Sequence, residues 1–255
     1  MTTTRQNGSL YTNIENKIAT IEFGHPASNS FPSELLERLA KEIISVGYND
    51  AVAIIILKSE GEKAFCAGAS FDELVAIDNV EDGKQFFSGF ANVINAMRTC
   101  GKLIIGRVQG KTVGGGVGLI AACDYVLATE KASVKLSEFS IGIGPFVIEP
   151  AVTRKIGVGA TAELTLDAAN WKNAYWAKEK GLYAKVFETQ KELDEEVELL
   201  SEKLASYNPV ALSEMKKALW KGTAQWNDLL AERAAVSGEL VLSDFTKKAL
   251  SKFKK

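Results

Sequence analysis

Hydrophobic residues along the first half of the chain recur with the periods of strands and helices in turn. Ala19, Ile21 and Phe23 alternate with polar residues, which is typical of a strand with one buried face. Leu35 and Leu39 lie four residues apart, as they do on the buried face of a helix. The alternation of such segments up to residue 136 predicts an α/β core with right-handed crossovers.

An uninterrupted apolar run at 52–57 is typical of a strand buried on both faces, as in a parallel sheet, and the largely apolar segment at 103–108 predicts the next buried strand. From residue 146 onward the pattern becomes helical, so we expect a sheet-containing core over 1–190 and a helical region over 191–255. Other strands are predicted within 10–23 around a turn at 15–17, at 125–128 and at 133–136. Helices are predicted at 30–46, 82–99, 147–156, 160–168, 174–180, 191–206, 209–221 and 226–241.

Two glycine-containing turns each follow a predicted buried strand and precede a helical segment. They lie at 64–69 (AFCAGA) and at 113–119 (VGGGVGL). Each turn alone is more often a packing device than a functional one. Together they present unpaired backbone N–H groups at two helix starts, and two such donors can hold one developing negative charge. The pair therefore indicates a candidate oxyanion hole.

Composition and charge exclude several classes of partner and compartment. The 255-residue chain has a net charge of −2, which gives no electrostatic basis for binding nucleic acid or an anionic membrane. Its three cysteines lie in apolar settings and favour a reducing compartment over a disulfide framework. The N-terminal residues are polar, and no apolar run is long enough to span a membrane. We therefore expect a cytoplasmic protein.

Motifs typical of other enzyme classes are incomplete, because particular residues that they require are missing. His25 is the single histidine of the chain, so no multi-histidine metal site can form, and no metal is expected. A Ser-His-Asp triad would have to use His25, which lies in a turn before both glycine loops. The sequence at 110–112 (GKT) lacks the first glycine of a phosphate-binding loop, because Ile105 stands there. The dinucleotide pattern at 116–121 has no room for its crossover helix.

Five segments, taken in order, resemble the crotonase (enoyl-CoA hydratase/isomerase) family. They lie at 63–69, 113–119, 122–124, 136–138 and 177–182, and together they extend over most of the chain. Tyr183 departs from the family pattern at the end of the last segment. The resemblance implies an α/β fold, a crotonase-like spiral of ββα units with a helical C-terminal trimerisation region. It also implies a homotrimer or a dimer of trimers.

The same resemblance assigns roles to residues of both glycine turns. Backbone N–H groups of Ala69 and Gly115 would bind the thioester oxygen of an acyl-CoA, and glycine at 115 would keep a side chain out of the ligand's way. Coenzyme A would be part of the substrate, with no separate cofactor. The remaining residues that would contact substrate or coenzyme A are Lys63, Ala67, Gly68, Gly114 and Phe146.

One departure from the family pattern bears on the reaction. Hydratases of the family carry two glutamates, and Gly118 stands where the first would be, whereas Glu138 matches the second. With one carboxylate, the simplest chemistry is a 1,3-proton shift, with a base whose pKa is raised by an apolar pocket. Glu149, Asp72 and Glu73 are alternative sources of a second acid, although a solvated surface position is the commoner state for such residues.

The sequence therefore favours Δ3–Δ2 isomerisation of an enoyl-CoA by a small margin over hydration. Phe146 lies where dienoyl-CoA isomerases of the family place an aspartate, which disfavours their reaction. Hydration stays open, including hydration of the methylglutaconyl-CoA type. A weakly catalytic acyl-CoA-binding scaffold also stays open because Gly118 carries no proton. The acidic pI of about 5.7 disfavours RNA binding, and the placement of His25 disfavours a serine protease on a related spiral.

Overall fold

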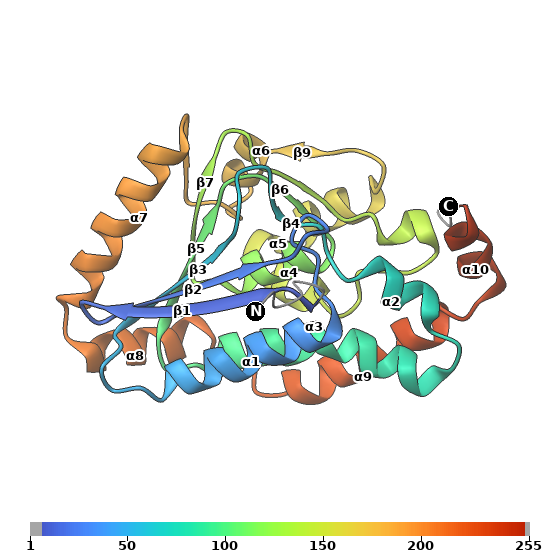
Figure 1. Cartoon of the computed structure of the whole chain (residues 1–255), viewed down its shortest axis with the longest axis horizontal. Coiled ribbons are helices and arrows are strands. Elements are labelled where there is room, and N and C mark those ends of the chain that lie inside the picture. The colour runs from blue at the N-terminus through green and yellow to red at the C-terminus, as the bar shows by residue number, and fades with distance from the viewer. Residues whose placement is uncertain (1–6, 253–255) are drawn as a thin grey trace, which may run out of the picture.

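The computed structural model describes residues 7–252, which form two β-sheets surrounded by helices (Figure 1). In the larger sheet the strand order is β1-β2-β3-β5-β7-β10, and only the β1–β2 pair is antiparallel. The predicted strands all lie here except the one at 133–136. The strands are β1 (Ser9–Glu15), β2 (Ile18–Gly24), β3 (Ile54–Ser59), β5 (Leu103–Val108), β7 (Tyr125–Thr129) and β10 (Lys185–Phe187).

The smaller sheet has the order β4-β6-β8-β9, and its first three strands are parallel. Each of these three strands directly follows a strand of the larger sheet, and each leads into a helix. The chain thus repeats the ββα unit three times, which agrees with the expected spiral. The strands are β4 (Ala64–Cys66), β6 (Lys111–Val113), β8 (Ser133–Lys135) and β9 (Lys172–Asn173).

Helices cover both faces of the larger sheet. Strand β3 is apolar throughout because both of its faces are buried. Ile55 faces the main core with α1, α3 and α4, while Ile54 and Ile56 face α7. In Figure 1, α7 lies along one side of the sheet, and α1, α3 and α9 lie together beneath β1. The helices are α1 (Ser33–Gly47), α2 (Phe71–Ala76), α3 (Val80–Thr99), α4 (Gly115–Ala122), η2 (a 3-10 helix, Glu138–Ile141), α5 (Glu149–Leu166), α6 (Ala174–Glu179), α7 (Gln190–Ala205), α8 (Pro209–Leu219), α9 (Trp226–Leu240) and α10 (Asp244–Ser251).

The C-terminal helices pack against the core at several points. α9 crosses α3 with backbone in contact, since a Cβ on Gly83 would lie 2.8 Å from the carbonyl oxygen of Gly238. α10 lies against η2, where the Thr246 hydroxyl donates a hydrogen bond of 3.2 Å to the Gly142 carbonyl oxygen. The first contact joins α9 to α3, and the second places α10 beside the turn that follows β8.

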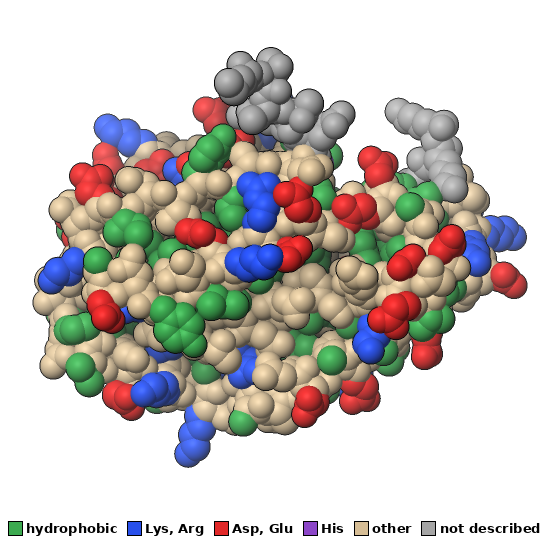
Figure 2. Space-filling view, turned by 60° about the horizontal axis from the view of Figure 1, so that its bottom comes forward, with side chains coloured by type: hydrophobic (Ala, Val, Ile, Leu, Met, Phe, Trp, Pro, Cys, Tyr) green, Lys and Arg blue, Asp and Glu red, His purple; other side chains and the backbone are tan. Residues whose placement is uncertain are grey.

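The surface carries charges of both signs. Figure 2 shows Lys and Arg side chains interspersed with Asp and Glu over the face that it presents. Within residues 7–252, no helix has the length and apolarity needed to cross a membrane.

Candidate active site

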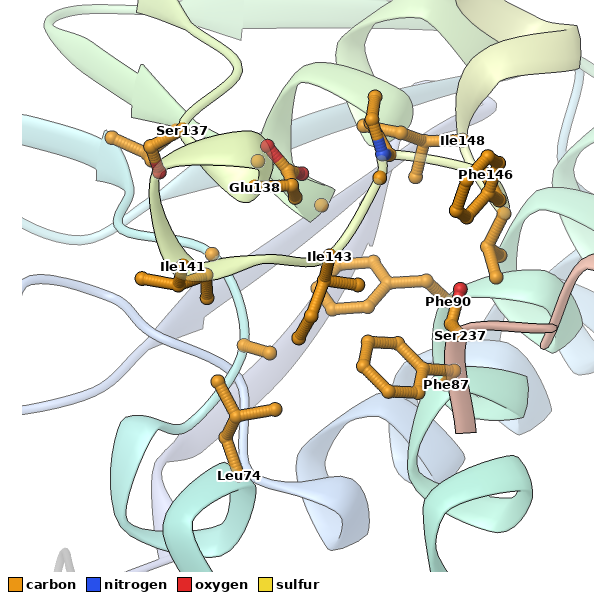
Figure 3. A pocket seen from close by; sticks show the side chains of 18 of the residues that line it. Leu74, Phe87, Phe90, Ser137, Glu138, Ile141, Ile143, Phe146, Ile148 and Ser237 are labelled. Carbon is orange, nitrogen blue, oxygen red and sulfur yellow. The ribbon is translucent and has the colours of Figure 1, made fainter. Parts of the chain in front are cut away.

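An apolar cavity of about 160 Å³ opens where the parallel strands of the smaller sheet end (Figure 3). Strands β4, β6 and β8 are neighbours and run in the same direction, so the turns that follow them meet at one edge of the sheet. These turns contribute Ala67, Gly68 and Ala69, then Gly114 and Gly115, then Ser137 and Glu138. The structure therefore brings together two glycine turns and a glutamate that lie far apart in the sequence.

The second glycine turn presents the start of α4 to the cavity. Gly114, which precedes the helix, has φ +54° and ψ −123°, a conformation that only glycine adopts readily. Its N–H donates to the carbonyl oxygen of Lys135 at 3.0 Å, which ties the turn to β8. The N–H of Gly115 belongs to the first turn of α4, so it has no acceptor within the helix. That N–H, at the positive end of the helix dipole, is suited to an anionic oxygen.

The first glycine turn is held by a bridge to Phe31. The Phe31 N–H donates to the Gly68 carbonyl oxygen at 2.8 Å, and the Phe31 carbonyl oxygen accepts from Ser70 N–H at 2.8 Å. In such a parallel bridge the central residue, Ala69, directs its own N–H away from the partner segment. No acceptor for the Ala69 N–H is found among the described residues. Ala69 and Gly115 thus both line the cavity with an unused backbone donor.

Glu138 is the first residue of η2, and its carboxylate is directed into the cavity (Figure 3). Its Oε2 atom is shielded from solvent and has no hydrogen-bond partner among residues 7–252. Burial raises the pKa of Glu138 from 4.5 to about 7, and the backbone N–H groups of Glu138 and Ser137 offset only part of this effect. A Cβ on Gly114 would lie 3.0 Å from Glu138 Oε1, so the glycine leaves room for the carboxylate.

The space beside Gly118 is filled by a neighbouring side chain. A Cβ on Gly118 would lie 2.4 Å from Cγ2 of Ile148, the residue that precedes α5. An acid at position 118 would therefore require Ile148 to move. Among the described residues that line the cavity, Glu138 is the only titratable one. The cavity thus holds one carboxylate and an otherwise apolar wall.

The three alternative acids lie outside the cavity wall. Glu149 accepts a hydrogen bond of 2.7 Å from the Thr153 hydroxyl. Glu73 accepts from the Ser33 hydroxyl at 2.6 Å, and the Asp72 side chain is exposed. Lys63 is also exposed and does not line the cavity, so its contact with coenzyme A stays a prediction.

Aromatic residues of α3 form a wall that the sequence did not assign to the site. The helical spacing of Phe86 and Phe90 is typical of core packing, and both are buried, yet both also line the cavity, together with Phe87. A Cβ on Gly115 would lie 2.3 Å from the Phe90 ring. The glycine at 115 therefore makes room for Phe90, whereas the sequence interpretation had assigned that space to the ligand. Phe146 also lines the cavity, and its contact with substrate stays a prediction; Ile148 and Ser237 line it without a sequence signal.

A metal site is not evident in the part of the chain that the structure describes, since no three His, Cys, Asp or Glu side chains cluster there. The cavity wall itself offers one carboxyl group and two backbone donors. Such a set can move a proton at a carbon atom next to a carbonyl group while holding the oxygen charge that results.

Comparison with known proteins gives a family and several relatives. The sequence model of the family described as Enoyl-CoA hydratase/isomerase matches residues 13–254. The Short-chain-enoyl-CoA hydratase of Clostridium acetobutylicum is 29% identical over 242 residues, which cover 94% of this chain and 92% of that protein. The peroxisomal Delta(3,5)-Delta(2,4)-dienoyl-CoA isomerase of Arabidopsis thaliana is 28% identical over 206 residues, covering 75% of this chain and 72% of that protein.

Solved structures show the same arrangement of strands and helices. An enoyl-CoA hydratase from Bacillus halodurans has a TM-score of 0.86 at 22% identity, covering 95% of this chain and 99% of that one. An enoyl-CoA hydratase from Bacillus anthracis has a TM-score of 0.77 at 30% identity, covering 91% of this chain and 90% of that one. The similarity therefore extends over nearly the whole chain.

Proposed function

The chain belongs to the enoyl-CoA hydratase/isomerase family, and from this premise we propose that it isomerises a Δ3-enoyl-CoA to the Δ2 isomer with Glu138 as its single acid and base. The observation that carries the proposal is the cavity with one carboxyl group. Position 118 is packed against Ile148, and the other lining side chains offer no second proton donor of comparable acidity. A 1,3-proton shift needs one group that takes a proton and returns it, whereas two-carboxylate hydration needs a second.

The proposed reaction has two proton transfers that balance. The Glu138 carboxylate removes a proton from C2 of the substrate, and the electron pair of that C–H bond moves toward the thioester carbonyl. The resulting dienolate carries its charge on the thioester oxygen, between the N–H groups of Ala69 and Gly115. Glu138 then returns the proton to C4, the C3–C4 double bond becomes single, and the C2–C3 double bond forms.

The electrostatics of Glu138 suit both halves of this cycle. A carboxyl group with a pKa of about 7 is partly ionised near neutral pH and also holds a proton readily once it has accepted one. The apolar wall that raises the pKa also excludes water, which would otherwise compete for the dienolate. Losing one of the two oxyanion donors would cost about 10²–10³ in rate, by analogy with oxyanion holes in general.

Hydration of a Δ2-enoyl-CoA is the second candidate, because several relatives are named hydratases. In that reaction Glu138 would have to activate water at C3 and also supply the proton at C2. The absence of an acid at position 118 is the feature that makes isomerisation the better proposal. The expected homotrimer or dimer of trimers and the cytoplasmic location stay predictions of the resemblance and the composition.

The deciding experiment measures both reactions on one preparation. The wild-type protein is assayed for isomerisation of a 3-enoyl-CoA and for hydration of crotonyl-CoA, beside Glu138→Gln and Glu149→Gln. Glu149 is the matched control, since it is a nearby glutamate outside the cavity wall. We expect the isomerisation rate to exceed the hydration rate and to fall by about 10²–10⁴ in Glu138→Gln, which removes the general base.

Glu149→Gln is expected to keep the isomerisation rate. Faster hydration than isomerisation by the wild-type protein would favour the second candidate. Full isomerase activity in Glu138→Gln would show that another group is the base.

A further inference from the structure

A short turn at 25–30, which contacts the segments before and after β4, has an uncommon backbone conformation. Ser28 and Asn29 both have positive φ angles, of +55° and +58°, which residues other than glycine adopt only occasionally. The Asn29 side chain is buried, whereas that of Ser28 is exposed. Two consecutive residues of this kind store strain unless the surrounding contacts hold them in place.

The contacts of Asn29 show what holds this turn. Its Nδ2 atom donates to the carbonyl oxygens of Glu60 at 2.7 Å and Ala64 at 2.9 Å. Its Oδ1 atom accepts from the backbone N–H of His25 at 3.0 Å. The side chain therefore joins the turn at 25–30 to both ends of the loop at 60–64, from which β4 begins.

Further hydrogen bonds carry this connection along the chain to the first glycine turn. The Ser28 carbonyl oxygen accepts from Ala67 N–H at 3.1 Å, and Phe31 bridges Gly68 and Ser70. Residues 28–31 thus contact the segment 64–70 at its start, at Ala67 and on both sides of Ala69. The orientation of the Ala69 N–H, which faces the cavity, depends on these contacts. Asn29 itself does not line the cavity.

We propose that Asn29 is a positioning residue, which sets the direction of the Ala69 N–H by tying the turn at 25–30 to the start of β4. This inference rests on the proposed function, since it assumes that the Ala69 N–H binds the thioester oxygen. Gln109 also donates to the Ala64 carbonyl oxygen, at 3.0 Å, but it follows β5, and the hydrogen bonds of its Nε2 atom go to Ser59, Gly61 and Ala64 rather than to the turn at 25–30. Asn29 is therefore the side chain that couples the two turns.

The test compares three substitutions in the full-length protein. Asn29→Gly tolerates the positive φ and removes all three side-chain hydrogen bonds. Asn29→Asp keeps the size and the acceptor for His25 N–H but loses the two donated bonds, and it serves if the glycine variant does not fold. Ser28→Gly is the matched control, because it changes a neighbouring residue of the same conformation whose exposed side chain makes no hydrogen bond within the described residues.

Two measurements separate positioning from a general loss of stability. The first is kcat and KM for the 3-enoyl-CoA, and we expect kcat to fall by about 10²-fold in both Asn29 variants, with KM little changed, because the oxyanion donors act mainly on the transition state. The second is the infrared carbonyl frequency of a bound saturated acyl-CoA labelled with ¹³C at the thioester carbon. We expect the wild-type protein and Ser28→Gly to lower this frequency, and the folded Asn29 variants to lower it less.

The outcomes distinguish this inference from the proposed function. If the wild-type protein binds acyl-CoA without lowering the carbonyl frequency, the oxyanion hole itself is wrong. If the wild-type protein lowers it and Glu138→Gln loses activity, but folded Asn29 variants match Ser28→Gly in kcat and carbonyl frequency, the positioning role is overturned. A fall in kcat with an unchanged carbonyl frequency would also overturn it, since Asn29 would then act through another part of the site.

Discussion

At the scale of single residues, the burial of one carboxyl group determines how this site responds to pH. Glu138 must be ionised to take a proton from carbon, and burial raises its pKa to about 7. We expect kcat/KM for isomerisation to rise about tenfold per pH unit below that value and to level off above it. A profile measured between pH 5 and 9 in the wild-type protein and in Glu149→Gln checks this. A rate that is constant down to pH 5 in both proteins would contradict it.

The same residue should make the folded protein less stable as pH rises. Its pKa is 4.5 for an exposed glutamate and about 7 in the folded chain, so between these values the folded state binds more protons than the unfolded state. The free energy of unfolding therefore decreases with pH across this window, by about 3 kcal/mol in total. We expect Glu138→Gln to be more stable than the wild-type protein at pH 8 by up to about this amount.

At pH 4 the side chain is uncharged in both proteins, so their stabilities should be similar there. Urea unfolding at the two pH values measures the difference. Equal stabilities at pH 8 would mean that the carboxylate is better solvated than its buried Oε2 atom indicates.

Two glycines show how far residue identity alone could describe the site. The resemblance to the family assigned an oxyanion donor to Gly115 and an acid position to Gly118, where glycine can supply no proton. It could not show that Ile148 fills the space beside Gly118 or that the Phe90 ring fills the space beside Gly115. Ile148 and Phe90 lie on elements far from these glycines in the chain, and a one-dimensional pattern does not say which side chains meet across elements.

At the scale of elements, the length of a helix or strand largely determined whether the sequence pattern predicted it. The long strands and helices have several periods of hydrophobic residues, and the structure confirms them within a few residues. Strands β4, β6, β8 and β10 have three residues each, too few for a full period, and η2 has four; of these, only β8 was predicted as a strand. Among these, β4, β6 and η2 lead directly into or form the site, so the smaller sheet that aligns the three turns could not be derived from the residues alone.

The crossing of α3 and α9 gives an element-scale prediction. A Cβ on Gly238 would lie 2.5 Å from the backbone nitrogen of Lys84 and 2.8 Å from the backbone carbon of Gly83, and neither atom can move without shifting a helix. We expect Gly238→Ala to lower the free energy of unfolding by about 1–3 kcal/mol through overpacking. It should also disturb the cavity, because the preceding residue, Ser237, lines it.

Gly159→Ala is the matched control for this substitution. Gly159 also lies in a helix, in the part of α5 that follows the non-helical φ of +77° at Gly157, but a Cβ there would meet no heavy atom within 4 Å. Alanine should therefore be neutral at Gly159 or should stabilise the helix by up to about 1 kcal/mol. Urea unfolding of both variants measures the contrast. If Gly238→Ala were as stable as Gly159→Ala, the two helices would not be in backbone contact.

At the scale of the whole molecule, a buried polar cluster attaches α8 to the core. Asp124, between α4 and β7, accepts hydrogen bonds from Lys216 Nζ at 2.6 Å, from Trp220 Nε1 at 2.8 Å and from the backbone N–H of Ile104 at 2.7 Å. The Asp124 and Lys216 side chains are only 5% and 2% exposed. A buried carboxylate destabilises the fold unless a counter-ion pairs with it. The cluster therefore couples the helical region after residue 190 to the sheet.

This coupling predicts that the core and the C-terminal helices unfold together, and that Lys216 is required for it. Lys216→Met should lower the free energy of unfolding by about 3–5 kcal/mol, because it leaves the Asp124 carboxylate buried without its counter-ion.

Lys217→Met is the adjacent control: its ion pair with Glu214 is exposed, and losing it should cost less than about 1 kcal/mol. Urea unfolding is followed by tryptophan fluorescence in a background that carries Trp171→Phe and Trp176→Phe, so that the signal comes from Trp220 and Trp226 in the C-terminal region. Circular dichroism reports on the whole chain. Coincident transitions in the wild-type protein, shifted strongly by Lys216→Met and little by Lys217→Met, are the expected result. A separate early fluorescence transition in the wild-type protein would mean that the region from 191 onward unfolds on its own and that the buried pair does not join it to the core.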